Sequence, residues 1–438
     1  MLCRQLFFAH GVMLLWVLAA CAPASESPAS SANEVVAPAG PESVGFASDQ
    51  LEVLNESLQR LVDQQEVAGM VTMLARHGEV IQFETFGYQD LEEGTPMETD
   101  TIFRIYSMTK PITGVAMMIL HEQGLWDLED SVSQHIPEFE GLQVAVEDEN
   151  GAIRQVPQDH PMTMRELMTH TGGLTYGFFS QSAVDTMYLQ VNVLDRDSTL
   201  QAMIDKLADI PLRHQPGSLW HYSVSVDVQG YIVEKLSGQT LPEFFEEHIF
   251  DPLGMVDSGF YVPAEKADRL APTVYDYGPD GELMPSALLV GDYSAPPGLP
   301  SGGGGMVSTA SDYMHFAQML LNRGELDGVR IMSTETVDMM RASHAATTAT
   351  GPAEAVQLPP GTGFGMDVAV TMDPATAGSP VGTGSYWWAG AAGTWFWIDP
   401  ENDLIFVGMA QHDYFDIANF VPLTQEWTYQ AMINHPGL

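Results

Sequence analysis

A serine and a lysine three residues apart, Ser107 and Lys110, are the pair in this sequence that most clearly suggests chemistry. On a helix this spacing places both side chains on one face, within reach of a hydrogen bond. A serine hydroxyl becomes a good nucleophile when a neighbouring base takes its proton. A lysine can be that base if burial and the positive end of a helix lower its pKa. The pair therefore suggests nucleophilic catalysis; a helix-capping serine beside a solvated lysine is the alternative.

The residues after the pair predict the helix that must carry it. Apolar residues such as Val115 and Met118 recur at helical spacing. Pro111 fits only near a first helical turn, which fixes the start close to Ser107. We therefore expect a helix from about Ser107 to Gly124, with one face buried.

The rest of the chain has a β-rich beginning, a helical middle and a β-rich end. A hairpin is expected around residues 70–86 and a strand at Phe364–Thr371. This order predicts an α/β (α+β) fold in which both ends of the chain build one domain and a mainly helical domain is inserted. The expected bounds are 45–115 plus 290–438 for the α/β domain and 116–289 for the helical domain.

The first 20 residues predict an export signal, because a basic residue precedes an apolar run too short to span a bilayer. The sequence Leu-Ala-Ala-Cys ending at Cys21 resembles a bacterial lipoprotein signal, in which the cysteine is lipidated. The residue after the cysteine is Ala22, which is compatible with sorting of the lipoprotein to the periplasmic side of the outer membrane. An ordinary secretory signal, giving a soluble periplasmic or secreted protein, is the alternative. Residues 21–44, rich in Ala, Ser and Pro, predict a disordered tether.

Charge and cysteine content exclude several functions. The chain has 58 acidic and 16 basic residues, a net charge of −42, which argues against nucleic-acid binding and against docking on anionic lipid. Membrane contact is therefore expected through the lipid anchor only. The acidic residues are spread along the chain. This distribution favours a general role in keeping the surface solvated over a role in attracting a cationic substrate. Only Cys3 and Cys21 are present, so we expect no disulfide, and we expect no metal or cofactor.

Several motifs in a fixed order resemble the serine β-lactamase-related family over about residues 45–430. This family includes class C β-lactamases, D-alanyl-D-alanine peptidases and family VIII carboxylesterases, and the last are the most similar. The resemblance implies a β-lactamase/DD-peptidase-like fold, with a mostly antiparallel sheet flanked by helices. The motifs are Phe-Arg-Ile-Tyr-Ser-Met-Thr-Lys (103–110), Thr-His-Thr-Gly-Gly-Leu (169–174), Trp-His-Tyr-Ser (220–223), Ile-Phe-Asp-Pro-Leu-Gly-Met (249–255) and Trp-Trp-Ala-Gly-Ala-Ala-Gly (387–393).

The resemblance assigns roles to three residues. Ser107 matches the acylated nucleophile, Lys110 its partner, and Tyr222 the tyrosine that carries a proton to the leaving group. The sequence leaves open whether Lys110 or Tyr222 is the resting base. The glycines at 302–305 are expected to form a tight turn near the active site, whereas the His-Thr-Gly triplet at 170–172 is interpreted as a structural turn.

The chain also departs from the penicillinase pattern. Trp388, Ala389 and Gly390 stand where those enzymes carry Lys or His, Thr or Ser, and Gly, so the cation that would pair with a substrate carboxylate is missing. An asparagine expected two residues after Tyr222 is also absent. Both changes favour neutral esters. The backbone N–H of Ala391, with that of Ser107, is the candidate oxyanion hole.

The function that these residues favour is a serine hydrolase that cleaves small carboxylic esters through an acyl-enzyme on Ser107. A β-lactamase or D-alanyl-D-alanine carboxypeptidase uses the same chemistry on cell-wall-related substrates and is the first alternative. A non-catalytic binding lipoprotein that has kept the fold is the second.

Overall fold

The first element that the structure describes ends at Val44. The computed structural model describes residues 40–148, 152–179, 181–287, 291–346, 356–413 and 420–433, within a compact unit from Pro38 onward. The expected signal peptide (1–20), Cys21 and most of the tether (21–44) lie outside the described residues. Residues Pro41–Val44 form the 3-10 helix η1, and Val44 is buried. Val44 packs into an apolar cluster, so residues 41–44, the last of the expected tether, belong to the folded region, which is expected to start near Val44.

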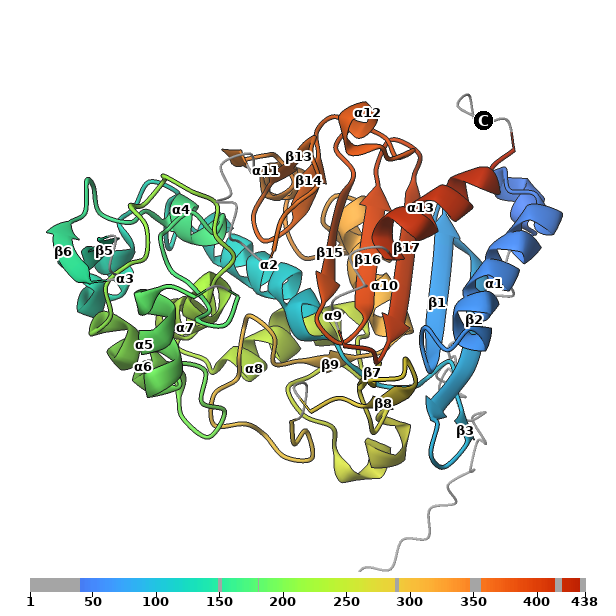
Figure 1. The fold of residues 1–438 in the computed structure, drawn as a ribbon. Helices are drawn as coiled ribbons and strands as arrows, with labels where there is room; N and C mark the ends of the chain where they lie inside the picture. Colours follow the sequence, from blue (N-terminus) through green and yellow to red (C-terminus); the bar gives the residue numbers. More distant parts are fainter. Residues whose placement is uncertain are drawn as a thin grey trace, which may run out of the picture. The chain divides into compact units, whose positions relative to one another are not determined.

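A nine-stranded sheet is the largest sheet among the described residues (Figure 1), and every neighbouring pair of its strands is antiparallel. Its centre joins the two ends of the chain, with Met70 opposite Ala410. The mostly antiparallel sheet and its assembly from both ends are confirmed. In sheet order the strands are β12 (Ala345–Ala346), β13 (Thr362–Phe364), β14 (Ala369–Thr371), β15 (Tyr386–Gly390), β16 (Thr394–Asp399), β17 (Leu404–Ala410), β1 (Gly69–Arg76), β2 (Glu79–Asp90) and β3 (Thr95–Pro96).

Helices and short strand pairs make up the rest of the described chain. The α-helices are α1 (Ser48–Asp63), α2 (Thr109–Glu122), α3 (Val132–His135), α4 (Met164–Met168), α5 (Ala183–Val191), α6 (Leu200–Ala208), α7 (Ser225–Ser237), α8 (Leu241–Phe245), α9 (Asp251–Leu253), α10 (Ala310–Leu321), α11 (Thr334–Met340), α12 (Pro374–Ala377) and α13 (Phe420–Gln430). Further 3-10 helices are η2 (Tyr106–Met108), η3 (Pro137–Phe139) and η5 (Ala264–Arg269), and η4 (Glu246–Phe250) is a π-helix. The paired short strands are β4 (Phe103–Arg104) with β9 (Val307–Ser308), β5 (Gln143–Glu147) with β6 (Ile153–Pro157), β7 (Tyr275–Tyr277) with β8 (Leu283–Pro285), and β10 (Glu325–Leu326) with β11 (Val329–Arg330).

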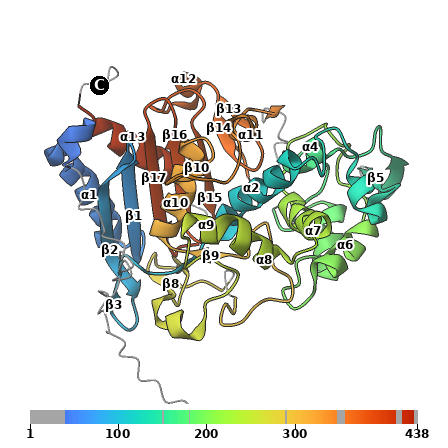
Figure 2. The same cartoon turned by 180° about the vertical axis from the view of Figure 1, so that it is seen from behind.

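The sheet is covered on both faces, as the residues of β16 show. Trp395 and Trp397 pack in one apolar cluster with α1 and α13, whereas Phe396 and Ile398 pack in the other with α10. Alternate residues of a strand point to opposite faces, so a strand that is apolar throughout needs cover on both sides. Helices α1 and α13 lie over one face in Figure 1, and α10 lies over the other in Figure 2.

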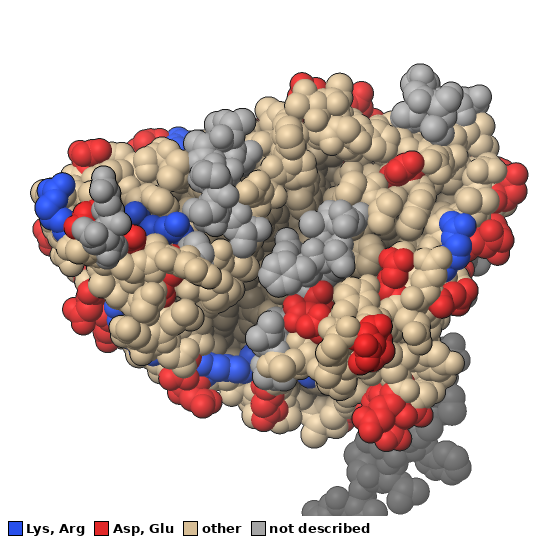
Figure 3. Space-filling view, in the orientation of Figure 1, with Lys and Arg blue, Asp and Glu red and all other residues tan. Residues whose placement is uncertain are grey.

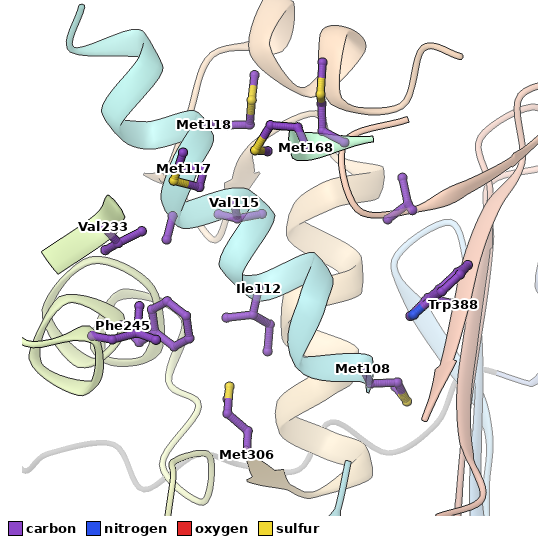
Figure 4. Packing of buried hydrophobic residues seen from close by; sticks show 14 of the residues in the cluster. Met108, Ile112, Val115, Met117, Met118, Met168, Val233, Phe245, Met306 and Trp388 are labelled. Carbon is purple, nitrogen blue, oxygen red and sulfur yellow. The ribbon is translucent and has the colours of Figure 1, made fainter. Parts of the chain in front are cut away.

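Helix α2 follows Ser107 as predicted and ends at Glu122, two residues before Gly124. The expectation of a single buried face is wrong, because every residue from Thr109 to Leu120 is buried. Methionine, valine and phenylalanine side chains of neighbouring segments surround the helix (Figure 4). A helix enclosed on all sides is fixed in position, and so is the pair at its start.

The middle of the chain, residues 116–289, contains α3 to α9, as the predicted helical insertion requires. This middle part contacts the rest of the compact unit, for example where α7 packs on α2. The division into two domains therefore stays a prediction. Among the residues that the structure describes, no helix is both long and apolar enough to cross a bilayer.

Candidate active site

Ser107 lies in the 3-10 turn η2, immediately before α2. The preceding Tyr106 has a positive φ of 40°, a conformation that side chains other than glycine rarely adopt. The lead-in to this turn is held by β4, which pairs with β9, and by a backbone hydrogen bond from Ile105 to Met306. The half-buried Ser107 hydroxyl is thus placed at a sharp change of chain direction between a fixed strand and a fixed helix.

Lys110 contacts Ser107 as the spacing predicts. Its Nζ donates to Ser107 Oγ at 3.1 Å and to the carbonyl oxygen of Gly303 at 2.6 Å. The side chain is only 1% exposed, and burial lowers the pKa of Lys110 to about 7, against the opposing charges of Asp227 and Asp367. The alternative of a solvated lysine is wrong. Gly303 also bears out the expected turn of glycines beside the site.

Tyr222 lies on the other side of the nucleophile. Its hydroxyl donates to Ser107 Oγ at 2.7 Å, and its ring centroid is 4.6 Å from Lys110 Nζ. Ser107, Lys110 and Tyr222 are therefore brought together from segments more than 100 residues apart. The Ser107 hydroxyl thus lies between an amine and a phenol. One of these two groups can accept the proton of Ser107, and the other can donate a proton to a leaving group.

Two buried carboxyl groups near Lys110 were missed by sequence reasoning. Asp227 accepts hydrogen bonds from Ser301 Oγ and Gly303 N, and Asp367 accepts one from Gln229. Burial raises the pKa of Asp227, and it raises that of Asp367 well above its ordinary value. Asp367 could have been noticed as one charged residue in an apolar run; Asp227 follows Tyr222 by five residues and offers no comparable local signal.

Trp388 belongs to the site. It is 4% exposed, and its ring lies 5.5 Å from the Tyr222 ring, so the expected apolar wall is present where a penicillinase has its cation. Its indole N–H finds no hydrogen-bond partner among the described residues. Trp387, one residue earlier on β15, packs with both apolar clusters.

Four more rings surround Tyr222, at 5.0 to 6.3 Å between centroids. The face of the molecule drawn in Figure 3 is hollowed near its centre, with mostly uncharged residues visible in the hollow and acidic and a few basic side chains around it. The triplet at 170–172 is a turn, as predicted, but the ring of His170 also packs against the Tyr222 ring, which the sequence did not reveal. The four residues are His170, Tyr176, Phe179 and Trp220.

Strand β15 comes very close to the segment before the nucleophile. A Cβ atom on Gly390 would lie 2.1 Å from the carbonyl oxygen of Ile105, and Thr394 Oγ1 donates to the same oxygen at 3.2 Å. Only glycine permits this approach. This close approach brings the turn that starts at Ala391 against the start of the Ser107 segment, as the candidate oxyanion hole requires. The roles of Ala389, Ala391 and the Ser107 N–H stay predictions.

Comparisons with known proteins agree with this geometry. A family model described as Beta-lactamase matches residues 54–420. The chain belongs to the beta-lactamase family. Protein Rv1367c of Mycobacterium tuberculosis is 36% identical over 365 residues, 81% of this chain and 88% of that protein. Esterase EstB of Burkholderia gladioli is 33% identical, over 78% of this chain and 86% of that protein.

Comparison with solved structures finds similar folds. EstCE1, described as a hydrolase with promiscuous acyltransferase activity, superimposes with a TM-score of 0.72 at 29% identity, covering 87% of this chain and 98% of that chain. The β-lactamase/DD-peptidase-like fold that the resemblance implied is thereby confirmed. The similar proteins thus include one named as an esterase and one described as a hydrolase.

Proposed function

We propose that this chain is a serine hydrolase that cleaves small carboxylic esters through an acyl-enzyme on Ser107. One observation carries the proposal: Ser107 Oγ lies 3.1 Å from a buried amine and 2.7 Å from a phenol hydroxyl. A buried amine with a pKa of about 7 is partly neutral at neutral pH and can accept a proton. The esterase relatives support the same reaction class.

The reaction proceeds in two halves. Ser107 Oγ attacks the ester carbonyl while its proton passes to the coupled pair formed by Lys110 and Tyr222. Backbone N–H groups at Ser107 and Ala391 hold the oxyanion. The Tyr222 hydroxyl then donates a proton to the departing alcohol, leaving an acyl group on Ser107. Water attacks this acyl group with the help of the same pair, which releases the acid and restores the serine hydroxyl.

Trp388 supports a neutral substrate. A lysine or histidine at this position would attract the carboxylate of a β-lactam or a peptide end, whereas an indole offers an apolar surface and one N–H. The ring is buried against Tyr222, within the catalytic arrangement itself. Esters without a charge near the reacting carbonyl are therefore the expected substrates.

Turnover by the purified full chain in detergent tests the proposal. We expect hydrolysis of short p-nitrophenyl esters that is lost in Ser107→Ala and kept in Ser218→Ala, since Ser218 is an exposed serine outside the site. Efficient cleavage of a chromogenic cephalosporin with little ester cleavage would favour the β-lactamase alternative. Absence of turnover together with absence of labelling by a serine-reactive phosphonate would favour the non-catalytic lipoprotein.

We also propose that the chain is exported as a lipoprotein to the periplasmic side of the outer membrane. The apolar run before Cys21, the cysteine itself and the Ala-, Ser- and Pro-rich residues after it support this location. Mass spectrometry of the mature N-terminus tests it, with an acylated Cys21 as the expected result. A Cys21→Ser variant should leave the membrane fraction; an unmodified N-terminus beyond Cys21 would instead indicate a soluble periplasmic or secreted protein.

A further inference from the structure

The segment between Gly173 and α5 carries aromatic residues that the acylation chemistry does not use. The ring of Phe178 lies 4.5 Å from that of Phe179 and 5.2 Å from that of Tyr176. Phe178 is nevertheless 58% exposed. A phenylalanine exposed to this extent fills no core. Phe178 continues outward from the half-buried Phe179 and the buried Tyr176, so the three rings lead from the protein interior to an exposed apolar surface that an apolar molecule can contact.

This aromatic group adjoins the ring of Tyr222. Tyr176 and Phe179 both contact the Tyr222 ring, at 5.2 and 5.7 Å between centroids. In the proposed reaction Tyr222 gives its proton to the departing alcohol, so the alcohol part of the ester must lie beside Tyr222. Phe179 and then Phe178 extend the surface that this part of the substrate meets.

The segment is held in place at both ends by one buried carboxylate. Asp185 Oδ1 accepts from Thr175 Oγ1 at 2.5 Å, and Oδ2 accepts from the backbone N and Oγ of Ser182 at 2.9 and 2.6 Å. The Thr175 hydroxyl also lies 3.0 Å from Nε2 of His221, the residue before Tyr222. Thr175 and Ser182, which flank the three rings, are thus tied to one carboxylate close to Tyr222, and such anchoring reduces the entropy lost on binding.

We propose that Phe178 and Phe179 form the binding surface for an apolar, ring-sized group in the alcohol part of the ester. The inference rests on the proposed function, because that function defines the side of the leaving group. Both side chains that form this surface are apolar rings, so it selects by apolar contact. Esters of arylalkyl alcohols are the substrate class that fits it.

Two matched ester pairs test the inference. Ethyl acetate and 2-phenylethyl acetate share an acyl group and differ in the alcohol; ethyl acetate and ethyl 3-phenylpropanoate share the alcohol and differ in the acyl group. In Phe178→Ala and Phe179→Ala we expect the preference for 2-phenylethyl acetate, as a ratio of kcat/KM values, to fall about tenfold, with no fall in the acyl pair. Phe178→Leu should keep most of the preference. Val256→Ala removes an exposed apolar side chain elsewhere and should change neither ratio.

Unchanged ratios in both phenylalanine variants, or a loss confined to the acyl pair, would overturn the inference and leave the proposed function standing. Binding of 2-phenylethanol to Ser107→Ala, measured by calorimetry, needs no turnover and separates the two claims. Adding Phe178→Ala to that variant should weaken binding about tenfold. Equal binding by both proteins would overturn the inference even if every ester is cleaved.

Discussion

Asp227 and Lys110 are joined through a single residue. The carboxylate of Asp227 accepts the backbone N–H of Gly303, and the carbonyl oxygen of the same Gly303 accepts the ammonium of Lys110. A Cβ on Gly303 would lie 2.4 Å from Asp227 Oδ2, so only glycine fits between them. The acid therefore acts on the lysine both through its charge and by fixing the carbonyl group that the lysine binds.

This link predicts the effect of Asp227→Asn. The amide keeps an oxygen that can accept the Gly303 N–H but removes a charge that raises the pKa of Lys110. We expect the inflection that Lys110 gives to the pH profile of kcat/KM to move to lower pH. Asp227→Ala also removes the oxygen that accepts the Gly303 N–H, so we expect a lower kcat than in Asp227→Asn. An unchanged inflection in Asp227→Asn would contradict the electrostatic role.

The pH dependence of the unaltered protein follows from the pKa of about 7 for Lys110. Below that pH the amine is protonated and accepts no proton from Ser107; above it the neutral amine does. We therefore expect kcat/KM for a neutral ester to rise from about pH 6 to about pH 8. A steady-state profile in buffers of constant ionic strength measures this, and a profile that falls over the same interval would be inconsistent with a neutral lysine as base.

The two proton-transfer groups should be needed for kcat more than for binding. Lys110→Met keeps an apolar side chain of similar length, and Tyr222→Phe removes only a hydroxyl. We expect each to lower kcat about 10²- to 10⁴-fold with a smaller change in KM. Lys235→Met and Tyr261→Phe change residues of the same types away from the site and serve as controls. A loss of activity below about tenfold in Tyr222→Phe would assign the proton transfer to Lys110 alone.

Gly390→Ala should separate the strand from the nucleophile. The new methyl group would lie 2.1 Å from the Ile105 carbonyl oxygen, a backbone atom that cannot turn away. We expect a lower thermal unfolding midpoint and a kcat reduced by about 10²-fold or more, since removal of a single oxyanion donor already costs that much. Gly259→Ala meets no atom closer than 3.6 Å and is the matched control. Full activity in Gly390→Ala would remove β15 from the catalytic arrangement.

Local patterns predicted the parts of the fold that local sequence determines. The start of α2 follows from the position of Pro111, and the hairpin of β1 and β2 follows from two apolar runs and a short turn. The strand expected at Phe364–Thr371 is wrong as one element. It is divided into β13 and β14 by a turn in which Asp367 has a φ of 61°. Gly365 and Asp367 are residue types that favour turns, but they stand in an otherwise apolar, strand-like run, and the turn is also stabilised by a distant partner, Gln229.

The candidate site shows the same division. Ser107 in η2 and Lys110 in the first turn of α2 are three residues apart in continuous helical turns, so their spacing alone predicted their contact. Tyr222 was found only through a resemblance, because a hydrogen bond across 115 positions leaves no periodic pattern in a sequence. Tyr176 and His170 were missed for that reason: each becomes part of the site only through the packing of separate segments around Tyr222.

The aromatic surface beside Tyr222 has a consequence for the fate of the acylated serine. Forward and reverse steps of a reaction share one transition state, so a surface that holds a departing alcohol also holds an arriving one. An alcohol bound against Phe178 and Phe179 then competes with water for the acyl group on Ser107. The partition between free acid and new ester then depends on how fully the alcohol occupies this surface and how fast it attacks relative to water, so we expect an arylalkyl alcohol in excess to favour ester exchange.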